Sequence, residues 1–395
     1  MNLLNLFGRE KLLFEEDIIN NEAFLKEKIS SSNFLVLGGA GTIGQAVVKE
    51  LFKRNPKKLH VVDISENNLV ELVRDLRSSF GYINGDFRTF AIDIGSEIYD
   101  RFIDSDGNYD YVFNLSALKH VRSERDPFTL MRMVHVNILN TIKTINHSKE
   151  NGVKKYFSVS TDKATNPVNM MGASKRIMEL FLIKESNEIP ISTARFANVA
   201  FSDGSLLHGF QQRVNKIQPI VAPSDVKRYF VTPQESGELC ILSCLIGENS
   251  DIFFPKLNNE LDQITFSEIA VNYLKSIGYE AFICKNENEA RELIKILPSS
   301  GKWPCYFSPT DTEGEKYFEE FHSSSEVIDL NLFNGIGVVK NSITLGNIDL
   351  NSFLTDLDKL QKSNNWEKSE LIKLFKTIIP DFNYKEASKN LDSKM

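Results

Sequence analysis

From residue 33 to about residue 256, short β-rich apolar runs alternate with segments of helical period. This alternation is typical of βαβ units, in which successive strands lie parallel and helices cover both faces of the sheet. The sequence therefore predicts an α/β fold with a doubly wound parallel sheet. Ligands of such sheets bind beyond the carboxyl ends of the strands, so each strand end predicts a binding loop. The predicted strands end at Leu37, at Asp63, near Asp93, near Ser116 and at Thr161.

Composition excludes several classes of protein. Of the 395 residues, 42% are hydrophobic and 25% charged, which argues against a disordered or fibrous chain. The net charge of −7 disfavours binding to nucleic acid or to an anionic membrane surface. The sequence has no apolar run long enough to span a bilayer, and its first residues predict no secretory leader. Four scattered cysteines without zinc-ligand spacing predict no metal site and a reducing, cytoplasmic location.

A glycine-rich loop follows the first predicted strand and opens a predicted helix. It places glycines at Gly38, Gly41 and Gly44, with Thr42 and Ile43 between the last two. Glycines in this context permit a tight turn, let the backbone approach a pyrophosphate, and let the helix pack on the strand. The N–H groups of the helix N-terminus then face the phosphates. We therefore predict a dinucleotide site on a Rossmann-type sheet.

An acidic residue stands where such a site needs one. Asp63 lies 19 residues beyond Gly44, at the end of the second predicted strand. A carboxylate there accepts hydrogen bonds from the adenosine ribose and repels a 2′-phosphate, so NAD is predicted over NADP. Asp93 is placed to meet the adenine amine, or else it only caps its own loop. The remaining predicted cofactor residues, at the ends of the third and fourth strands, are Ile94, Ser116 and Ala117.

The alternation of short apolar runs and helical segments begins at residue 33 and becomes less regular after residue 200. The sequence therefore predicts four parts. Residues 1–32 form an N-terminal helical extension, whose amphipathic start indicates packing against a domain or another subunit and not a membrane anchor. Residues 33–200 form the NAD-binding domain. Residues 201–285 form a smaller substrate-binding lobe that is interleaved with it. Residues 286–395 form a C-terminal extension with a charged helix and two amphipathic helices.

The fifth predicted strand ends in chemically active residues. Thr161, Asp162 and Lys163 place a hydroxyl, a carboxylate and an amine in sequence, and Lys175 follows on the next predicted helix. Beside a nicotinamide such a set can transfer protons, because desolvation could make one member of the Asp162/Lys163 pair an acid and the other a base near neutral pH. The alternative is a solvated turn that carries an ordinary Asp/Lys pair.

Four segments together resemble a known family. They are the glycine loop, LSALKHV (115–121), VSTDKATNPVNMMGASK (159–175) and ARFANV (194–199). They resemble the extended short-chain dehydrogenase/reductases, and within these the nucleotide-sugar 4,6-dehydratases of bacterial polysaccharide synthesis, typified by UDP-N-acetylglucosamine 4,6-dehydratases. The resemblance is close over residues 33–260 and looser at GEKYFEEF (314–321). It implies a tightly held NAD, a UDP-sugar substrate and a homo-oligomeric enzyme.

The resemblance also implies a redox-neutral mechanism. NAD takes a hydride from C4 of the sugar, Lys163 removes the C5 proton, Asp162 protonates the departing C6 hydroxyl, and the hydride returns to C6. Met171 occupies the position of the family's usual tyrosine base, and a thioether cannot take a proton. Thr161 is then the expected relay for the C4 hydroxyl proton, with Lys175 or Lys163 assisting, and the final acceptor stays open. Lys175 matches the lysine that grips the nicotinamide ribose.

The substrate end is assigned by the same resemblance. Lys119 and His120 line the mouth of the active site, Asn198 contacts the diphosphate or the sugar, and Arg228 faces the pyrophosphate. Arginine suits a phosphate because its planar fork makes two parallel bonds. Lys119 and His120 are otherwise a solvated helix start. The alternative functions are a nucleotide-sugar 4-epimerase, which needs no acid and base at C5 and C6, and a non-catalytic NAD-binding protein.

Overall fold

The computed structural model describes residues 3–257, 263–310, 319–340, 346, 348–363 and 366–384. Most of the acidic segment that precedes Glu319 therefore lies outside the described residues. Within them the main sheet has nine strands, in the order β14-β15-β10-β6-β5-β4-β1-β2-β3. Its strands are β1 (Asn33–Leu37), β2 (Lys58–Asp63), β3 (Asp86–Ala91), β4 (Tyr111–Asn114), β5 (Lys155–Thr161), β6 (Ile191–Phe196), β10 (Ile252–Pro255), β14 (Ile328–Asp329) and β15 (Ile336–Val339).

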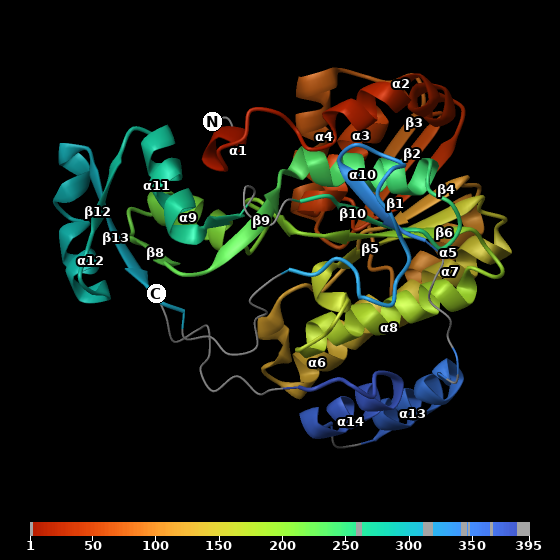
Figure 1. Ribbon diagram of the computed structural model, residues 1–395. Coiled ribbons are helices and arrows are strands. Elements are labelled where there is room, and N and C mark those ends of the chain that lie inside the picture. Colours follow the sequence, from red (N-terminus) through yellow and green to blue (C-terminus); the bar gives the residue numbers. More distant parts are fainter. Residues whose placement is uncertain are drawn as a thin grey trace.

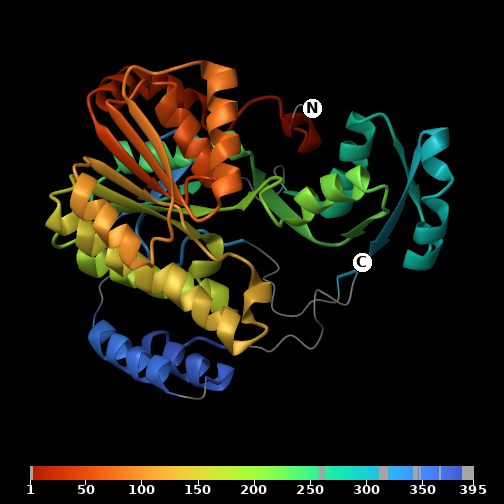
Figure 2. The same ribbon diagram turned by 180° about the vertical axis from the view of Figure 1, so that it is seen from behind.

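Seven of these strands, from β3 across to β10, run parallel, as the alternation of the sequence predicts. Helices cover both faces of the sheet (Figures 1 and 2). One face carries α2 (Glu15–Ser30), α3 (Thr42–Phe52), α4 (Glu66–Phe80) and α10 (Pro233–Leu245). The other carries α5 (Glu97–Asp106), α6 (Pro127–Val134), the π-helical turn η2 (His135–Leu139), α7 (Asn140–Glu150) and α8 (Met170–Glu185). The predicted doubly wound α/β fold is confirmed.

The two-sided burial explains the composition of the strands. In β1, Phe34 and Val36 join the apolar cluster under α3 and α10, while Leu35 and Leu37 join the cluster under α5 and α7. A strand covered on both faces needs apolar residues at every position, because successive side chains point to opposite faces. The continuous apolar run FLVL is therefore a consequence of the central position of β1.

A second lobe stands beside the main sheet (Figure 1). It contains two three-stranded sheets, in the orders β12-β13-β8 and β11-β9-β7, and its apolar cluster includes Trp303 and Phe210. Its elements are β7 (Asn198–Val199), α9 (Leu206–Asn215), β8 (Ile220–Pro223), β9 (Lys227–Val231), β11 (Gln263–Thr265), α11 (Phe266–Ser276), β12 (Glu280–Ile283), α12 (Glu287–Leu293), the turn η4 (Leu297–Ser300) and β13 (Lys302–Ser308).

The segment expected as a C-terminal extension contributes to all parts of the molecule. β13 pairs with β8 and β12 in the second lobe, and β15 pairs antiparallel with β10 in the main sheet. The helices α13 (Leu350–Lys362) and α14 (Lys368–Ile378) pack through Phe353 and Phe375 against the α6 and α8 side of the molecule (Figure 2). These contacts bring residues far apart in the chain close to the strand ends that carry the site.

The N-terminal segment packs against both lobes of the molecule. Leu6 of α1 (Leu3–Leu6) joins the cluster of the second lobe, and Leu25 of α2 joins the main cluster beside α10. Between them, Arg9 forms a double hydrogen bond with the buried carboxylate of Glu235, at 2.6 and 3.0 Å. None of the helices described is both long enough and apolar enough to pass through a bilayer.

Candidate active site

The glycine loop joins the end of β1 to the N-terminus of α3. Gly38 has φ +69°, and a Cβ there would lie 2.7 Å from the backbone nitrogen of Ser116. A Cβ on Gly44 would collide with the carbonyl oxygen of Gly38. At Gly41, the N-cap of α3, a Cβ would meet only the Gly38 oxygen at 3.6 Å. The loop is thus closed on its sheet side and open at the helix N-terminus, which fits a pyrophosphate.

Asp63 holds this loop in place. Its Oδ2 accepts a 2.9 Å hydrogen bond from the backbone N–H of Ala40, and its Oδ1 accepts one of 2.9 Å from Ser65. The residue is half-buried. A carboxylate can accept about four hydrogen bonds, so capacity is left for ribose hydroxyls. In the structure Asp63 therefore lies directly beside the glycine loop.

Removing the charge of Asp63 should weaken discrimination against NADP. Asp63→Asn keeps an acceptor for the Ala40 N–H but no longer repels a 2′-phosphate, and we expect the NAD/NADP affinity ratio to fall by about tenfold, or about 1.4 kcal/mol. Titrating the cofactor-free protein with each dinucleotide measures this ratio. Asp63→Ala should weaken both affinities further, because it also releases the loop. An unchanged ratio in both variants would remove Asp63 as the discriminating residue.

The other predicted cofactor residues lie along the same edge of the sheet. Ser116 directly faces Gly38, and Ala117 follows it. Asp93 is exposed two residues beyond β3, where its Oδ1 accepts a 2.8 Å bond from Gly95, and the neighbouring Ile94 is buried. Asp93 also lines a cavity of about 410 Å³ shared with α6, η2 and the segment before α14.

Thr161, Asp162 and Lys163 form one connected group where β5 passes into the turn η3 (Asp162–Ala164). The Thr161 hydroxyl donates a 2.7 Å hydrogen bond to Asp162 Oδ1, and the Lys163 ammonium lies 3.3 Å from the same oxygen. Asp162 is only 3% exposed. The group is therefore not a solvated turn. It offers a hydroxyl, a carboxylate and an amine in contact, at the carboxyl end of a central strand.

The two predicted residues of α8 differ in environment. The Lys175 ammonium is buried below the end of β5, where it donates a 3.0 Å bond to the Val159 carbonyl, and burial lowers its pKa to about 8. Met171 is buried in the apolar cluster of α6, α8 and α13. Its backbone N–H donates a 2.8 Å bond to the buried carboxylate of Glu124, in the turn η1 (Val121–Glu124). Met171 thus packs the helix start and leaves proton transfer to other groups.

The predicted substrate residues occupy two places. Lys119 and His120 are exposed, and desolvation by the surrounding protein lowers the pKa of both groups. The His120 ring stands directly against Gly204, in the loop whose Asp203 N–H donates a 3.1 Å bond to the Thr42 hydroxyl. This loop therefore links the predicted mouth to the cofactor loop.

Asn198 and Arg228 lie on the paired strands β7 and β9. Asn198 on β7 donates to the Tyr229 carbonyl of β9 at 3.3 Å, and Arg228 is the residue before Tyr229. Asn198 also donates to a carboxylate that the residue patterns did not single out, that of Glu319. Burial, followed by the negative charge of Asp162, raises the pKa of Glu319 to about 7. The signal that could have pointed to Glu319 was the acidic segment GEKYFEEF (314–321), but this segment resembled the family only loosely.

A buried ion network behind β5 was also missed. Arg195 of β6, with no solvent exposure, forms double hydrogen bonds to Glu179 of α8 and to Glu326 of the segment before β14. Ser160, next to Thr161, donates a 2.6 Å bond to Glu179. The network ties β5, β6, α8 and the Glu326 segment together directly behind the reactive group. Glu179 and Arg195 are 16 residues apart and Glu326 is 131 further on, so no local pattern reveals it.

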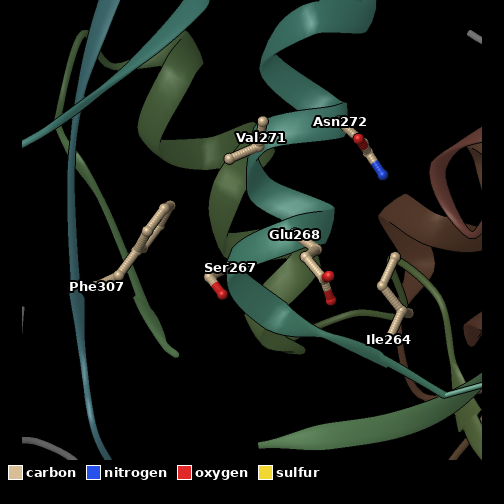
Figure 3. A pocket seen from close by; sticks show the side chains of 6 residues that line it. All are labelled: Ile264, Ser267, Glu268, Val271, Asn272 and Phe307. Carbon is tan, nitrogen blue, oxygen red and sulfur yellow. The ribbon is translucent and has the colours of Figure 1, made fainter. Parts of the chain in front are cut away.

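A second cavity, of about 430 Å³, lies in the second lobe away from these residues. Figure 3 shows Phe307 of β13 on one side and Ser267, Glu268 and Val271 of α11 on the other. Ile264 of β11, which also lines it, pairs with Arg228 of β9. The cavity is thus connected to the predicted phosphate residue through one strand pair.

Comparison with known proteins identifies the family. A family model described as "Polysaccharide biosynthesis protein" matches residues 34–340, which is more than half of the chain. The chain belongs to this polysaccharide biosynthesis protein family. The resemblance predicted from the four sequence segments, including membership of the extended short-chain dehydrogenase/reductases, is confirmed.

Three proteins with sequences similar to this chain carry different descriptions. A Methanocaldococcus jannaschii protein described as an uncharacterized membrane protein is 32% identical, covering 82% of this chain and 88% of its own length. A UDP-N-acetylglucosamine 4,6-dehydratase (inverting) of Campylobacter jejuni is 26% identical, and the match covers 58% of this chain and 68% of the relative. A UDP-glucose 4-epimerase of Rickettsia typhi is 28% identical, and the match covers 72% of this chain and 86% of the relative.

Among solved structures, Pen from Bacillus thuringiensis has the same fold. Its TM-score is 0.63 at 23% identity, covering 79% of this chain and 88% of that one. This similarity of structure confirms the predicted Rossmann-type fold. Together the relatives make this chain a member of a group of nucleotide-sugar dehydratases and epimerases.

Proposed function

We propose that this protein is an NAD-dependent nucleotide-sugar 4,6-dehydratase acting on UDP-N-acetylglucosamine, with a 4-keto-6-deoxy sugar as product. The contact of Thr161, Asp162 and Lys163 on one strand end carries this proposal. The steps at C5 and C6 need a base and an acid close together, and the Asp162/Lys163 pair offers both. The relative named as a dehydratase supports the same reaction.

The residues of the glycine loop suit NAD. The open side at Gly41 would hold the pyrophosphate, Asp63 would accept from the adenosine ribose, and Lys175, buried beside Val159 of β5, would hold the nicotinamide ribose. NAD, when bound, supplies a hydride acceptor for C4 and a hydride donor for C6. Because the same dinucleotide serves both steps, it must stay bound between them, and the protein's contacts hold it in position.

The protein's own side chains handle the protons. Once C4 is a ketone, the C5 proton becomes acidic, because the negative charge of the carbanion spreads onto the carbonyl oxygen. Lys163 in its neutral form removes that proton, and Asp162 in its acid form protonates the departing 6-hydroxyl. The Thr161 hydroxyl donates to Asp162, so a proton that the 4-hydroxyl gives to Thr161 passes along this bond to Asp162. The proton lost at O4 then leaves with O6 as water. When the hydride returns to C6, the proton held by Lys163 returns to C5, so that protons and electrons balance.

A 4-epimerase is the second candidate, because one relative carries that name. An epimerase uses the same cofactor and sugar, but it transfers no proton at C5 and expels no hydroxyl at C6. The contact between Lys163 and a buried Asp162 would then have no chemical use. We therefore rank it below the dehydratase.

Incubation with UDP-N-acetylglucosamine distinguishes the two reactions. We expect mass spectrometry of the product to show a sugar nucleotide lighter by one water molecule, formed without added reductant. An isobaric product would identify an epimerase. An unchanged substrate, also when other UDP-sugars are supplied, would contradict both catalytic functions.

A further inference from the structure

Residues 3–14, here called the strap, connect the two lobes from outside the main chain crossings. Figures 1 and 2 both show α1 beside the second lobe and apart from α2. At one end of the strap, Leu6 is buried in the second lobe, where its carbonyl accepts a 3.0 Å hydrogen bond from Asn272 of α11. At the other end, Phe14 has no solvent exposure and lies in the apolar cluster of the main sheet. A segment anchored in both lobes limits their movement relative to one another.

The middle of the strap holds β9 of the second lobe. The ring of Phe7 stacks on that of Phe230, with centroids 5.4 Å apart and planes inclined by 8°. The Arg9 guanidinium donates a 3.2 Å hydrogen bond to the Phe230 carbonyl, besides its two bonds to the Glu235 carboxylate. Glu235 has no solvent exposure. A double bond between a guanidinium and a buried carboxylate fixes both position and orientation, so β9 is held in one place.

Glu235 also joins the strap to the helix that follows β9. Its Oε1 accepts a 2.8 Å bond from the Leu13 N–H, and its Oε2 accepts one of 2.6 Å from the N–H of Thr232, the N-cap of α10. Helix α10 packs closely on α3, because a Cβ on Gly237 would lie 2.7 Å from the backbone of Ala46. The glycine loop opens α3. The strap therefore covers the point at which the chain passes from the second lobe to the helices beside the cofactor loop.

The strand β9 and its neighbours carry the predicted substrate residues. Phe230 lies opposite Asn198 of β7, and Arg228 lies two positions before Phe230, opposite Ile264 of β11. Any displacement of β9 would therefore move Arg228 and Asn198 together, relative to the reactive group at the end of β5.

We propose that the strap fixes the orientation of the second lobe for the sugar nucleotide, and that Phe7 and Arg9 are positioning residues that act through β9. The inference rests on the proposed function, which gives Arg228 and Asn198 a diphosphate and a sugar to bind. The family match begins at residue 34, so the strap lies outside it. The strand β5, which carries the reactive group, belongs to the main sheet. The strap should therefore act on substrate binding and not on the chemical step.

Titration of the NAD-bound protein with UDP, followed by calorimetry, tests this role. Phe7→Ala removes the stacked ring but leaves the pair of Arg9 and Glu235, whereas Arg9→Lys keeps the positive charge but not the parallel double bond. Each variant should weaken UDP binding by about tenfold and raise the KM for the sugar nucleotide by about the same factor. The NAD content should be that of the native protein, and kcat should change by less than about twofold. Lys11→Ala is the matched control, because Lys11 is an exposed residue of the same strap.

The outcomes separate the possible failures. Native UDP affinity and KM in both variants would overturn the inference. So would a parallel loss of kcat, NAD content and UDP affinity, because that pattern indicates a general structural role. If the native protein binds UDP more tightly than both variants but forms no dehydrated product, the proposed dehydration is wrong and the role of the strap stands. If the native protein does not bind UDP, both the inference and the proposed substrate are wrong.

Discussion

Replacing Lys163 by alanine is expected to lower the rate of sugar dehydration by about 10²–10⁴-fold while NAD stays bound, the usual contribution of a positioned proton-transfer group. The Lys163 ammonium lies 3.3 Å from Asp162, and its side chain is about one-third exposed, so it reaches the space above the strand end. The glycine loop and Asp63 do not depend on it. Catalysis and cofactor binding should therefore separate in this variant.

Asp162→Asn should have an effect of the same size. The asparagine retains an oxygen that accepts from the Thr161 hydroxyl, but it has no proton to give to the 6-hydroxyl. Product formation followed by mass spectrometry, together with the NAD content of each purified variant, measures both properties. Lys154→Ala is the matched control, because Lys154 lies beside the opposite end of β5, where its exposed ammonium forms an ion pair of 2.8 Å with Asp110. An active Lys163→Ala/Asp162→Asn double variant would remove both residues from the mechanism.

Replacing Arg195 by methionine is expected to reduce the free energy of unfolding by about 3–5 kcal/mol, because it removes the doubly bonded counter-charge of two buried carboxylates. Burial acts to raise the pKa of Glu179, but the charge and hydrogen bonds of Arg195 outweigh it and lower the pKa to about 2. Glu326 depends on the same guanidinium. The variant should also lose activity, since Arg195 anchors the segment of Glu319.

The pH dependence of this loss follows from the same pKa. A carboxylate with a lowered folded-state pKa contributes stability above its unfolded value, and this stability disappears as pH falls toward 2. In Arg195→Met, protonation relieves the carboxylates that have lost the charge of Arg195, so urea unfolding should show a smaller destabilisation at about pH 5 than at about pH 7. Arg176→Met removes a partly exposed partner of Glu179 and should cost about 1 kcal/mol or less. An equal loss in both variants would contradict the assigned role of Arg195.

Local sequence signals predicted the ends of strands with useful precision. β1, β2 and β5 end at Leu37, Asp63 and Thr161 as expected, whereas β3 and β4 end two residues before Asp93 and Ser116. Apolar periodicity and glycine spacing act over a few residues, so they can be read without knowledge of the fold. The strand β13 was not foreseen, because it begins in a Pro/Ser/Gly segment and depends on pairing with β8, where Cys305 lies opposite Ile220.

The sequence by itself determined the doubly wound sheet, the dinucleotide loop and the run of Thr161, Asp162 and Lys163, because each depends on backbone sterics, helix and strand period, or direct neighbours in the chain. Only the tertiary structure decided the environment of that run. Asp162 is buried, Arg195 joins Glu179 to Glu326, and Glu319 comes to the active site from more than 150 residues away. Burial and charge depend on which segments pack together, and that packing is set by the folded chain as a whole.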